Sequence, residues 1–229
     1  MTVPTISRRS LLASVPGVSG PTVVIDTFRA FTTAAFLLER GVDRIVLTET
    51  LEEARELAIS IPDSILCGEE EGRKPDGFDL GNSPVDAQRY DDPTGRVIVM
   101  RTSAGTRSVV GALRSGAGPV YGASLVVATA TASALRNRST VAIIASGLSG
   151  IAIADEDEET ADLIASRLLE HADDPERVDR IRSGAGAKRL RTTPWINPDD
   201  LERCLEVDRF DFAMRARFEN GVAVLRRES

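Results

Sequence analysis

Short apolar runs alternate along the chain with stretches in which apolar residues recur every three or four positions. The runs predict buried strands at residues 23–25, 44–47, 64–67, 96–100, 120–121 and 141–145. The stretches between them predict helices. In the first, Phe31, Ala34, Ala35 and Leu38 fall on one face and Gly41 is well placed to end the helix. Strands separated by helices of this length predict right-handed crossovers. We therefore expect an α/β fold, a three-layer α/β/α domain with a mostly parallel central sheet or, as the alternative, a mixed one.

Further patterns refine this prediction. Thr50 and Glu53 have the spacing of a capping box at the start of one helix. A later helix is predicted to bury Leu125, Ala128, Thr129 and Ala132. Five consecutive acidic residues, 155–159, precede a helical stripe and suit the positive end of its dipole. No linker is long enough to divide the chain, so we expect a single domain over residues 1–229.

Composition narrows the classes of protein. The net charge of −7 argues against a general binder of nucleic acid or anionic membrane, because such proteins need a basic face. The cations are almost all arginine, whose planar fork suits phosphate, sulfonate and carboxylate. Two cysteines make no disulfide framework, which favours a reducing cytoplasm. Residues 7–12 resemble a twin-arginine export signal, but the apolar run behind them ends at Pro16 and is too short.

A polar loop at residues 26–33 follows the first predicted strand, where an α/β sheet collects its ligands. Asp26 occupies the strand end, the position of a metal ligand or a nucleophile. Arg29, Thr32 and Thr33 follow at a helix N-terminus, whose free N–H groups and dipole favour an anion. The plainer alternative is that Asp26 caps the helix and the threonines close its first turn.

A second loop, residues 101–107, follows another apolar strand. Its small hydroxylated residues and Gly105 would let backbone amides approach an oxyanion. It lacks the spacing and the lysine of a Walker A loop. A generic turn from strand to helix is the alternative.

The third loop, residues 67–84, crowds glycines and prolines among acidic residues and two cations, and cannot form a long helix. Magnesium prefers oxygen ligands and keeps several waters, so two or three carboxylates suffice to bind it. Glu69, Glu70 and Asp79 are candidates. The alternative is a solvated surface loop.

Two residues invite other chemistry. Cys67 and Arg73 have the spacing of a cysteine-dependent phosphatase, but the three glutamates between them would repel both a thiolate and a phosphate dianion. The lone histidine, His171, lies among charged residues at a predicted helix end, and we expect it on the surface. A general base would therefore be a carboxylate or a water activated by a metal.

With these residues in hand, the chain resembles the ComB family of magnesium-dependent 2-phosphosulfolactate phosphatases. The resemblance rests on VVIDTFRAFTTA, RTSAGTRSV, CGEEEGRKPDGFDLGNSP and CLEVDRFDFAMR, which together span most of residues 23–214. GFDLGNSP is the most specific segment. The family usually reads closer to DVLRATTT at residues 26–33 and tends to carry an asparagine where this chain has Ala104.

The resemblance implies Mg²⁺-dependent hydrolysis of 2-phosphosulfolactate to 3-sulfolactate and phosphate, a step toward coenzyme M in methanogens. It implies catalytic roles for Asp26, Arg29 and Glu69, and Mg²⁺ held or oriented by Asp26, Glu69 and Asp79. The phosphate or sulfonate would be received by Arg29, Thr32, Thr33, Ser103, Gly105, Thr106 and Arg107, with Asn82 and Ser83 closing the pocket. Asp26 either attacks phosphorus or positions a water that does so.

Two other classes of function stay open at this point. The chain could hydrolyse another small phosphoester, or it could bind an anion without catalysis. The density of carboxylates beside the arginines favours an enzyme. The expected partner is a small anionic phosphorylated substrate, with no nucleic acid or membrane, and a homodimer is the default for the assembly.

Overall fold

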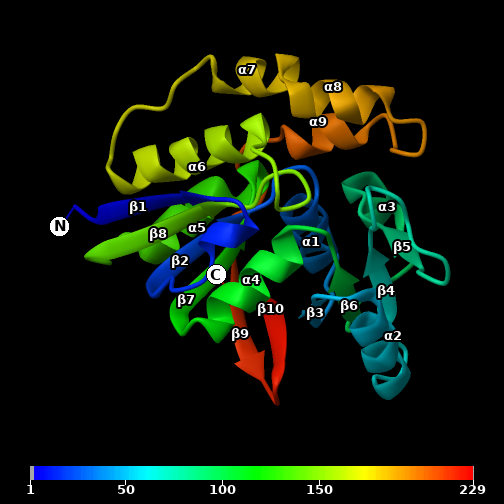
Figure 1. The fold of residues 1–229 in the computed structure, drawn as a ribbon. Helices are drawn as coiled ribbons and strands as arrows, with labels where there is room; N and C mark the ends of the chain where they lie inside the picture. Colours follow the sequence, from blue (N-terminus) through cyan, green and yellow to red (C-terminus); the bar gives the residue numbers. More distant parts are fainter. Residues whose placement is uncertain (1–2, 229) are drawn as a thin grey trace.

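The computed structural model describes residues 3–228, and every strand in it belongs to one sheet with the order β1-β8-β2-β7-β9-β10-β3-β6-β4-β5 (Figure 1). The strands are β1 Thr5–Ser10, β2 Gly20–Ile25, β3 Arg44–Thr48, β4 Ile65–Gly68, β5 Leu80–Gly81, β6 Val97–Arg101, β7 Ala117–Ala123, β8 Thr140–Ala145, β9 Ala213–Glu219 and β10 Val222–Glu228. The α-helices are α1 Ala30–Glu39, α2 Leu51–Ser60, α3 Pro84–Arg89, α4 Gly105–Arg114, α5 Ala128–Leu135, α6 Asp155–Leu168, α7 Arg177–Ser183, α8 Ala185–Thr192 and α9 Asp200–Cys204. Two short 3₁₀ turns are η1 Leu12–Ser14 and η2 Leu125–Val127.

The sheet consists of two parallel blocks joined by an antiparallel hairpin. Strands β1, β8, β2 and β7 form one block, and β3, β6, β4 and β5 form the other. The C-terminal strands β9 and β10 lie between the blocks and pair antiparallel with β7, with each other and with β3. The expected α/β fold with a mostly parallel sheet is confirmed, and the hairpin makes that sheet mixed.

The three antiparallel pairings reverse the strand direction between the two blocks. In a flat sheet their carboxyl ends would therefore lie at opposite edges. Neighbouring strands twist relative to one another, and the twist accumulates over ten strands. Figure 1 accordingly shows β1 and β8 lying across the direction of β9 and β10. The carboxyl ends of β2 and β6 are close in space, because the Gly105 amide that follows β6 donates to the Asp26 side chain that follows β2.

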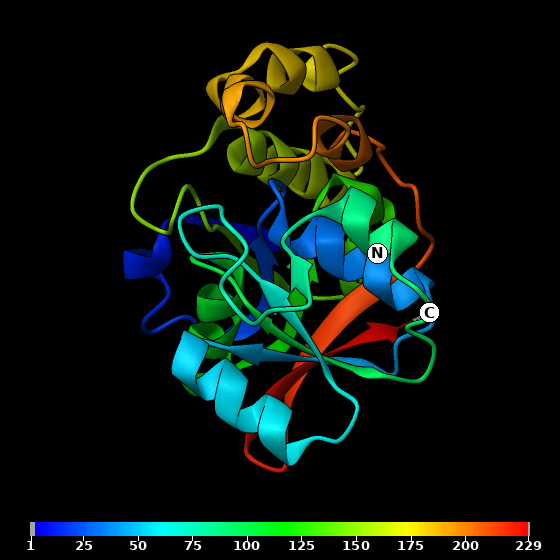
Figure 2. The same ribbon diagram turned by 90° about the vertical axis from the view of Figure 1, so that its right-hand side faces the viewer.

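Helices cover both faces of the sheet, as a three-layer fold requires. Helices α2 and α4 lie on one face, and α1 and α5 lie on the other (Figures 1 and 2). Helix α6 packs beside α5, and α7 and α8 form an outer layer above α6 (Figure 2). Helix α1 approaches β7 closely, since a Cβ on Gly122 would lie 2.7 Å from the Phe31 ring. The predicted stripe of α1 is buried throughout.

Two local predictions need comment. Thr50 caps α2 by accepting from the Glu53 amide at 3.1 Å, but the Glu53 carboxylate accepts from the amide of Glu49 at 2.9 Å instead of that of Thr50. The prediction that Thr129 belongs to a buried helix face is wrong. It is exposed, and its hydroxyl donates to Asp208 at 2.9 Å. The tighter turn η2 precedes α5 and shifts the phase of the stripe.

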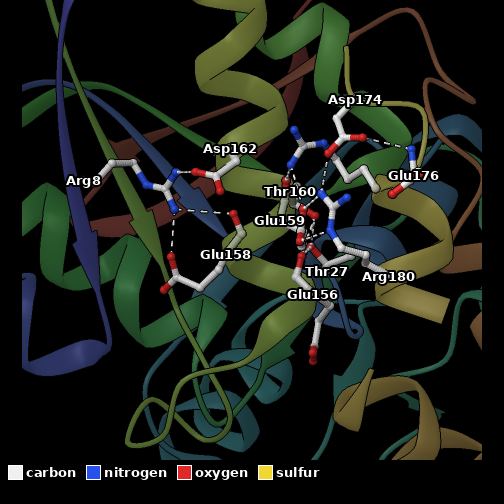
Figure 3. Close-up of polar contacts among 11 residues, drawn as sticks. Arg8, Thr27, Glu156, Glu158, Glu159, Thr160, Asp162, Asp174, Glu176 and Arg180 are labelled. Atoms are coloured by element: carbon white, nitrogen blue, oxygen red, sulfur yellow. Dashed lines mark hydrogen bonds and ion pairs between the residues drawn. The ribbon is translucent and has the colours of Figure 1, made fainter. Parts of the chain in front are cut away.

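The arginine-rich segment near the N-terminus forms the edge strand β1. Arg8 extends from this strand to Glu158 and Asp162 on α6 (Figure 3). The segment that resembles an export signal is thus part of the sheet. Over residues 3–228, none of the helices combines the length and the apolar character needed to cross a membrane.

Candidate functional site

A cavity of about 310 Å³ lies where the carboxyl ends of the two parallel blocks meet the helical layer formed by α6 and α8. Five residues that the sequence analysis proposed line it: Asp26, Arg29, Glu69, Asn82 and Ser103. The opposite wall carries residues that the sequence analysis did not propose: Leu148, Glu156, Asp157, Arg189, Leu190, Thr193, Trp195 and Ile196. The cavity is therefore built by segments from both halves of the chain.

Asp26 is buried at the end of β2, and two helix N-termini hold its carboxylate. Its Oδ1 accepts from the Ala30 amide of α1 at 3.1 Å, and its Oδ2 accepts from the Gly105 amide of α4 at 2.9 Å. Burial raises the pKa of Asp26 to about 6, with the nearby Glu69 carboxylate adding to the increase and the two amide bonds opposing it. Gly105 permits this contact, since a Cβ there would lie 2.8 Å from Oδ2.

Glu69 follows β4 and is also held by backbone amides. Its Oε1 accepts from the Ser103 amide at 2.6 Å, and its Oε2 accepts from the Gly72 amide at 2.7 Å and from the Ser103 hydroxyl at 3.2 Å. The loop between β6 and α4 thus orients both Asp26 and Glu69 toward the same cavity. The amides of Ser103 and Gly105, expected to bind an oxyanion of the substrate, hold the protein's own carboxylates instead.

Asp157 brings the first loop together with the loop after β8. Its Oδ1 accepts from the Thr27 amide at 2.7 Å and its Oδ2 from the Gly147 amide at 2.9 Å. Burial raises its pKa to about 8, and the charge of Asp26 contributes to the increase. The first turn of α6 is thereby fixed to the strand ends that carry the site.

The acidic run at the start of α6 has a different partner for each of its members, because successive residues on a helix point about 100° apart. Asp155 accepts from the first amides of α8, Glu158 pairs with Arg8, and Glu159 pairs with Arg180 at 2.7 Å. Glu156 points away from both arginines (Figure 3) and lines the cavity. The sequence analysis explained the acidic run by the helix dipole alone and therefore missed two cavity residues, Glu156 and Asp157. The length of the run could have indicated them, because the dipole does not require five acidic residues.

Arg29 lines the cavity but is committed to a buried ion pair. Its Nη1 donates to Asp200 of α9 at 2.7 Å, and its Nη2 donates to the Gly72 carbonyl at 3.4 Å. Asp200 has no exposed surface and also accepts from the hydroxyl of Ser83 at 2.6 Å. The structure therefore gives Ser83 a supporting position behind the cavity, where it also caps α3 by accepting from the Asp86 amide.

The remaining predicted residues do not line the cavity. Asp79 is exposed, and its Oδ2 accepts from the Leu66 amide at 2.8 Å. The Thr32 hydroxyl donates to the Thr27 carbonyl at 2.9 Å, so it closes the first turn as the plainer alternative proposed. Thr33 is fully buried in α1. Thr106 bonds back to Thr102 within its own turn.

Arg107 lies in a separate hollow on the far side of the same loop, beside Glu49, Glu70 and Arg101. Its Nη1 donates to the Ser103 carbonyl at 3.4 Å. In this arrangement it supports the loop that orients Asp26 and Glu69 and does not face the cavity.

Cys67 is unsuited to nucleophilic chemistry. It has no exposed surface, and its Sγ donates to the Gly81 carbonyl at 3.4 Å. Burial raises the pKa of its thiol to about 12, so the thiolate is not accessible near neutral pH. His171 is exposed at the end of α6, as predicted.

The donor atoms of the cavity fit Mg²⁺. They are carboxylate and amide oxygens, and the Asn82 Oδ1 atom is buried with no hydrogen-bond partner among residues 3–228. Within the same residues, no three His, Cys, Asp or Glu side chains converge as a ready-made metal cage. Mg²⁺ characteristically binds through one or two carboxylates and keeps several waters. Asp26 and Glu69 suit that pattern, whereas Asp79 lies outside the cavity.

Comparisons with known proteins agree on one family. A family model described as 2-phosphosulpholactate phosphatase matches residues 10–217. A protein of Thermus thermophilus named probable 2-phosphosulfolactate phosphatase is 40% identical over 174 residues, which are 75% of this chain and 71% of that protein. A protein of the same name from Bacillus subtilis is 30% identical over 212 residues and covers 90% of each chain. One from Thermotoga maritima is 31% identical over 218 residues, 89% of this chain and 91% of the relative.

Proposed function

The chain belongs to the 2-phosphosulfolactate phosphatase family, and on this premise we propose that its cavity hydrolyses 2-phosphosulfolactate to 3-sulfolactate and inorganic phosphate. The observation that carries the proposal is the pair of buried carboxylates, Asp26 and Glu69, which amides of one loop orient into the same cavity. A protein that only bound anions would gain nothing from two buried carboxylates facing its ligand.

Asp26 suits the role of general base toward the attacking water. A carboxylate with a pKa of about 6 is a stronger base than an ordinary aspartate and is still largely ionised at neutral pH. The water oxygen would form a bond to phosphorus as its proton passes to Asp26. The bond between phosphorus and the ester oxygen would then break, and its electron pair would stay on that oxygen, which takes a proton from solvent water and leaves as the hydroxyl of sulfolactate. Asp26 would return the proton it received to the solvent, which restores its carboxylate.

We propose that Glu69 would also hold Mg²⁺, with Asn82 within the same cavity. Asp26 would orient the ion without binding it directly, since direct coordination would lower the pKa that makes Asp26 a base. When bound, the ion would supply positive charge to the phosphate oxygens and favour attack by water. The need for such charge follows from the cavity itself, since Asp26 and Glu69 face a substrate that is also anionic. Arg29 would offset less of this negative charge, because it is already paired with Asp200.

The test is phosphate release from synthetic 2-phosphosulfolactate and 2-phospholactate, each measured with Mg²⁺ and with EDTA. We expect turnover that requires Mg²⁺ and prefers 2-phosphosulfolactate. Turnover of 2-phospholactate alone would support phosphatase activity but would contradict the proposal that 2-phosphosulfolactate is the substrate. No release from either compound by folded protein with Mg²⁺ would contradict the proposed function.

A further inference from the structure

Two arginines line the cavity among the described residues, and their situations differ. Arg29 is almost fully buried and pairs with Asp200 at 2.7 Å. Arg189, on α8, makes a single longer contact, from its Nη2 to Glu156 Oε1 at 3.4 Å, and its side chain is 35% exposed. Arg189 is therefore the less committed of the two guanidinium groups.

Glu156 does not cancel the charge of Arg189. Its side chain is only 3% exposed, and its Oε2 has no hydrogen-bond partner within residues 3–228. Burial raises the pKa of Glu156 to about 9, and the neighbouring acidic side chains of Asp155 and Asp157 add to the increase. At neutral pH its carboxyl group is therefore mostly uncharged, which leaves the positive charge of Arg189 uncompensated.

The position of Arg189 is built into the fold. Asp155 accepts from the Ala185 and Gly186 amides at 2.8 and 3.2 Å, which fixes the start of α8 against α6. The backbone of Gly186 lies directly on the Glu156 carboxyl group, since a Cβ there would lie 2.1 Å from Oε2. The guanidinium of Arg189 is thus held on the helical wall of the cavity, while Asp26 and Glu69 belong to the strand ends.

We propose that Arg189, with Glu156 beside it, binds the sulfonate group of the substrate and so selects phosphorylated acids that carry a second strong anion. This inference rests on the proposed function and names the residue that sets its specificity. In 2-phosphosulfolactate the sulfonate stands on the carbon next to the one that carries the phosphate. With the phosphate near Asp26, Glu69 and the ion that Glu69 would hold, the sulfonate extends toward the opposite wall. A guanidinium fork there binds a tetrahedral oxyanion by charge-assisted hydrogen bonds.

The test compares wild type with Arg189→Gln on two substrates that differ only in the sulfonate, 2-phosphosulfolactate and 2-phospholactate. We expect the ratio of their kcat/KM values to fall by about 10- to 100-fold, the worth of hydrogen bonds to a charged group. Arg189→Lys keeps the charge without the fork and should recover part of the ratio. Lys188→Gln removes one positive charge from the neighbouring, exposed position of α8 and should leave the ratio unchanged.

Calorimetric binding of 3-sulfolactate and lactate separates this inference from the proposed function. We expect Arg189→Gln to weaken binding of 3-sulfolactate by about 10-fold or more and to leave lactate binding nearly unaltered. If wild type releases no phosphate, the proposed function fails, yet this comparison still decides the role of Arg189. An unchanged ratio and unchanged 3-sulfolactate binding would overturn the inference. So would equal weakening of lactate binding, which would assign Arg189 to the carboxylate.

Discussion

At the scale of residues, the site consists of carboxylates held where helix N-termini would otherwise receive an anion. Free amides at a helix start favour negative charge, and at Asp26 two such helices supply one bond each. Burial and the Glu69 charge oppose them and prevail, so the pKa of Asp26 is raised to about 6. The result is a carboxylate that is fixed in direction and has basicity close to that needed at neutral pH.

Replacing Asp26 by asparagine tests the site with little change in shape. Asparagine has nearly the same shape, but it removes the negative charge and places an NH₂ group against one of two amide donors. Loss of the negative charge would remove the proton acceptor and would also weaken the binding of Mg²⁺. The fold should tolerate it, because α1 and α4 remain packed on the sheet through buried apolar residues.

The sequence identified the residues that follow strand ends and missed those on the opposite wall. Asp26 and Glu69 could be found because a carboxylate directly after an apolar run belongs to the ligand-binding edge of the sheet. Arg189 could not, since α8 is polar on most of its surface and nothing local indicates which of its cations faces inward. That choice depends on the packing of α8 against α6.

At the scale of elements, the ion pair of Arg29 and Asp200 connects the start of α1 to the start of α9. Both side chains are buried, so removing Asp200 would leave an uncompensated charge. We expect Asp200→Ala to lower the free energy of unfolding by about 3 kcal/mol, measured by urea denaturation. Asp199→Ala is the matched control: its side chain is 66% exposed and lies 3.9 Å from Arg89. It should change the stability by less than about 0.5 kcal/mol. Equal effects of the two substitutions would contradict the importance assigned to the buried pair.

Each run that predicted a strand overlaps an observed strand, because a short apolar run between two amphipathic helices is typical of a buried strand. The sequence also predicts a terminal strand at residues 222–225, which lies within β10, whereas β1 and β9 were harder to predict. In β9 the buried Met214 and Ala216 alternate with the exposed Arg215 and Arg217, a signal that was present in the sequence. In β1 the two adjacent arginines concealed a strand, because Arg8 pairs with α6 and Arg9 donates to the Ser14 carbonyl.

At the scale of the whole molecule, the site gathers several buried acids whose charges the protein alone does not balance. Burial raises the pKa values of Asp26, Asp157 and Glu156 to about 6, 8 and 9. Their values in the unfolded chain are near 4, so between about pH 4 and 9 the folded protein binds more protons than the unfolded one. Stability is therefore greatest at the acidic end of this range and declines as the pH rises through the folded-state values.

We predict that the melting temperature in EDTA falls steadily from pH 5.5 to 9, and that Glu156→Gln reduces the slope at the upper end of this range. The amide cannot ionise, so that variant has one buried charge fewer to create. Glu158→Gln, on the same helix but facing Arg8, should shift the melting temperature without changing its slope above pH 7. A melting temperature that is constant or rises over this range in wild type would contradict the assignment of buried protonated acids.

The most direct test of the account is phosphate release from 2-phosphosulfolactate by wild type and Asp26→Asn, assayed side by side with Mg²⁺. The variant should be folded, with a melting temperature near that of wild type. It should have lost at least about 100-fold in kcat, the lower end of what general base catalysis contributes. Near-normal turnover by folded Asp26→Asn would contradict the account, because the cavity at the meeting point of the two blocks could not then be the place where the phosphoester is hydrolysed.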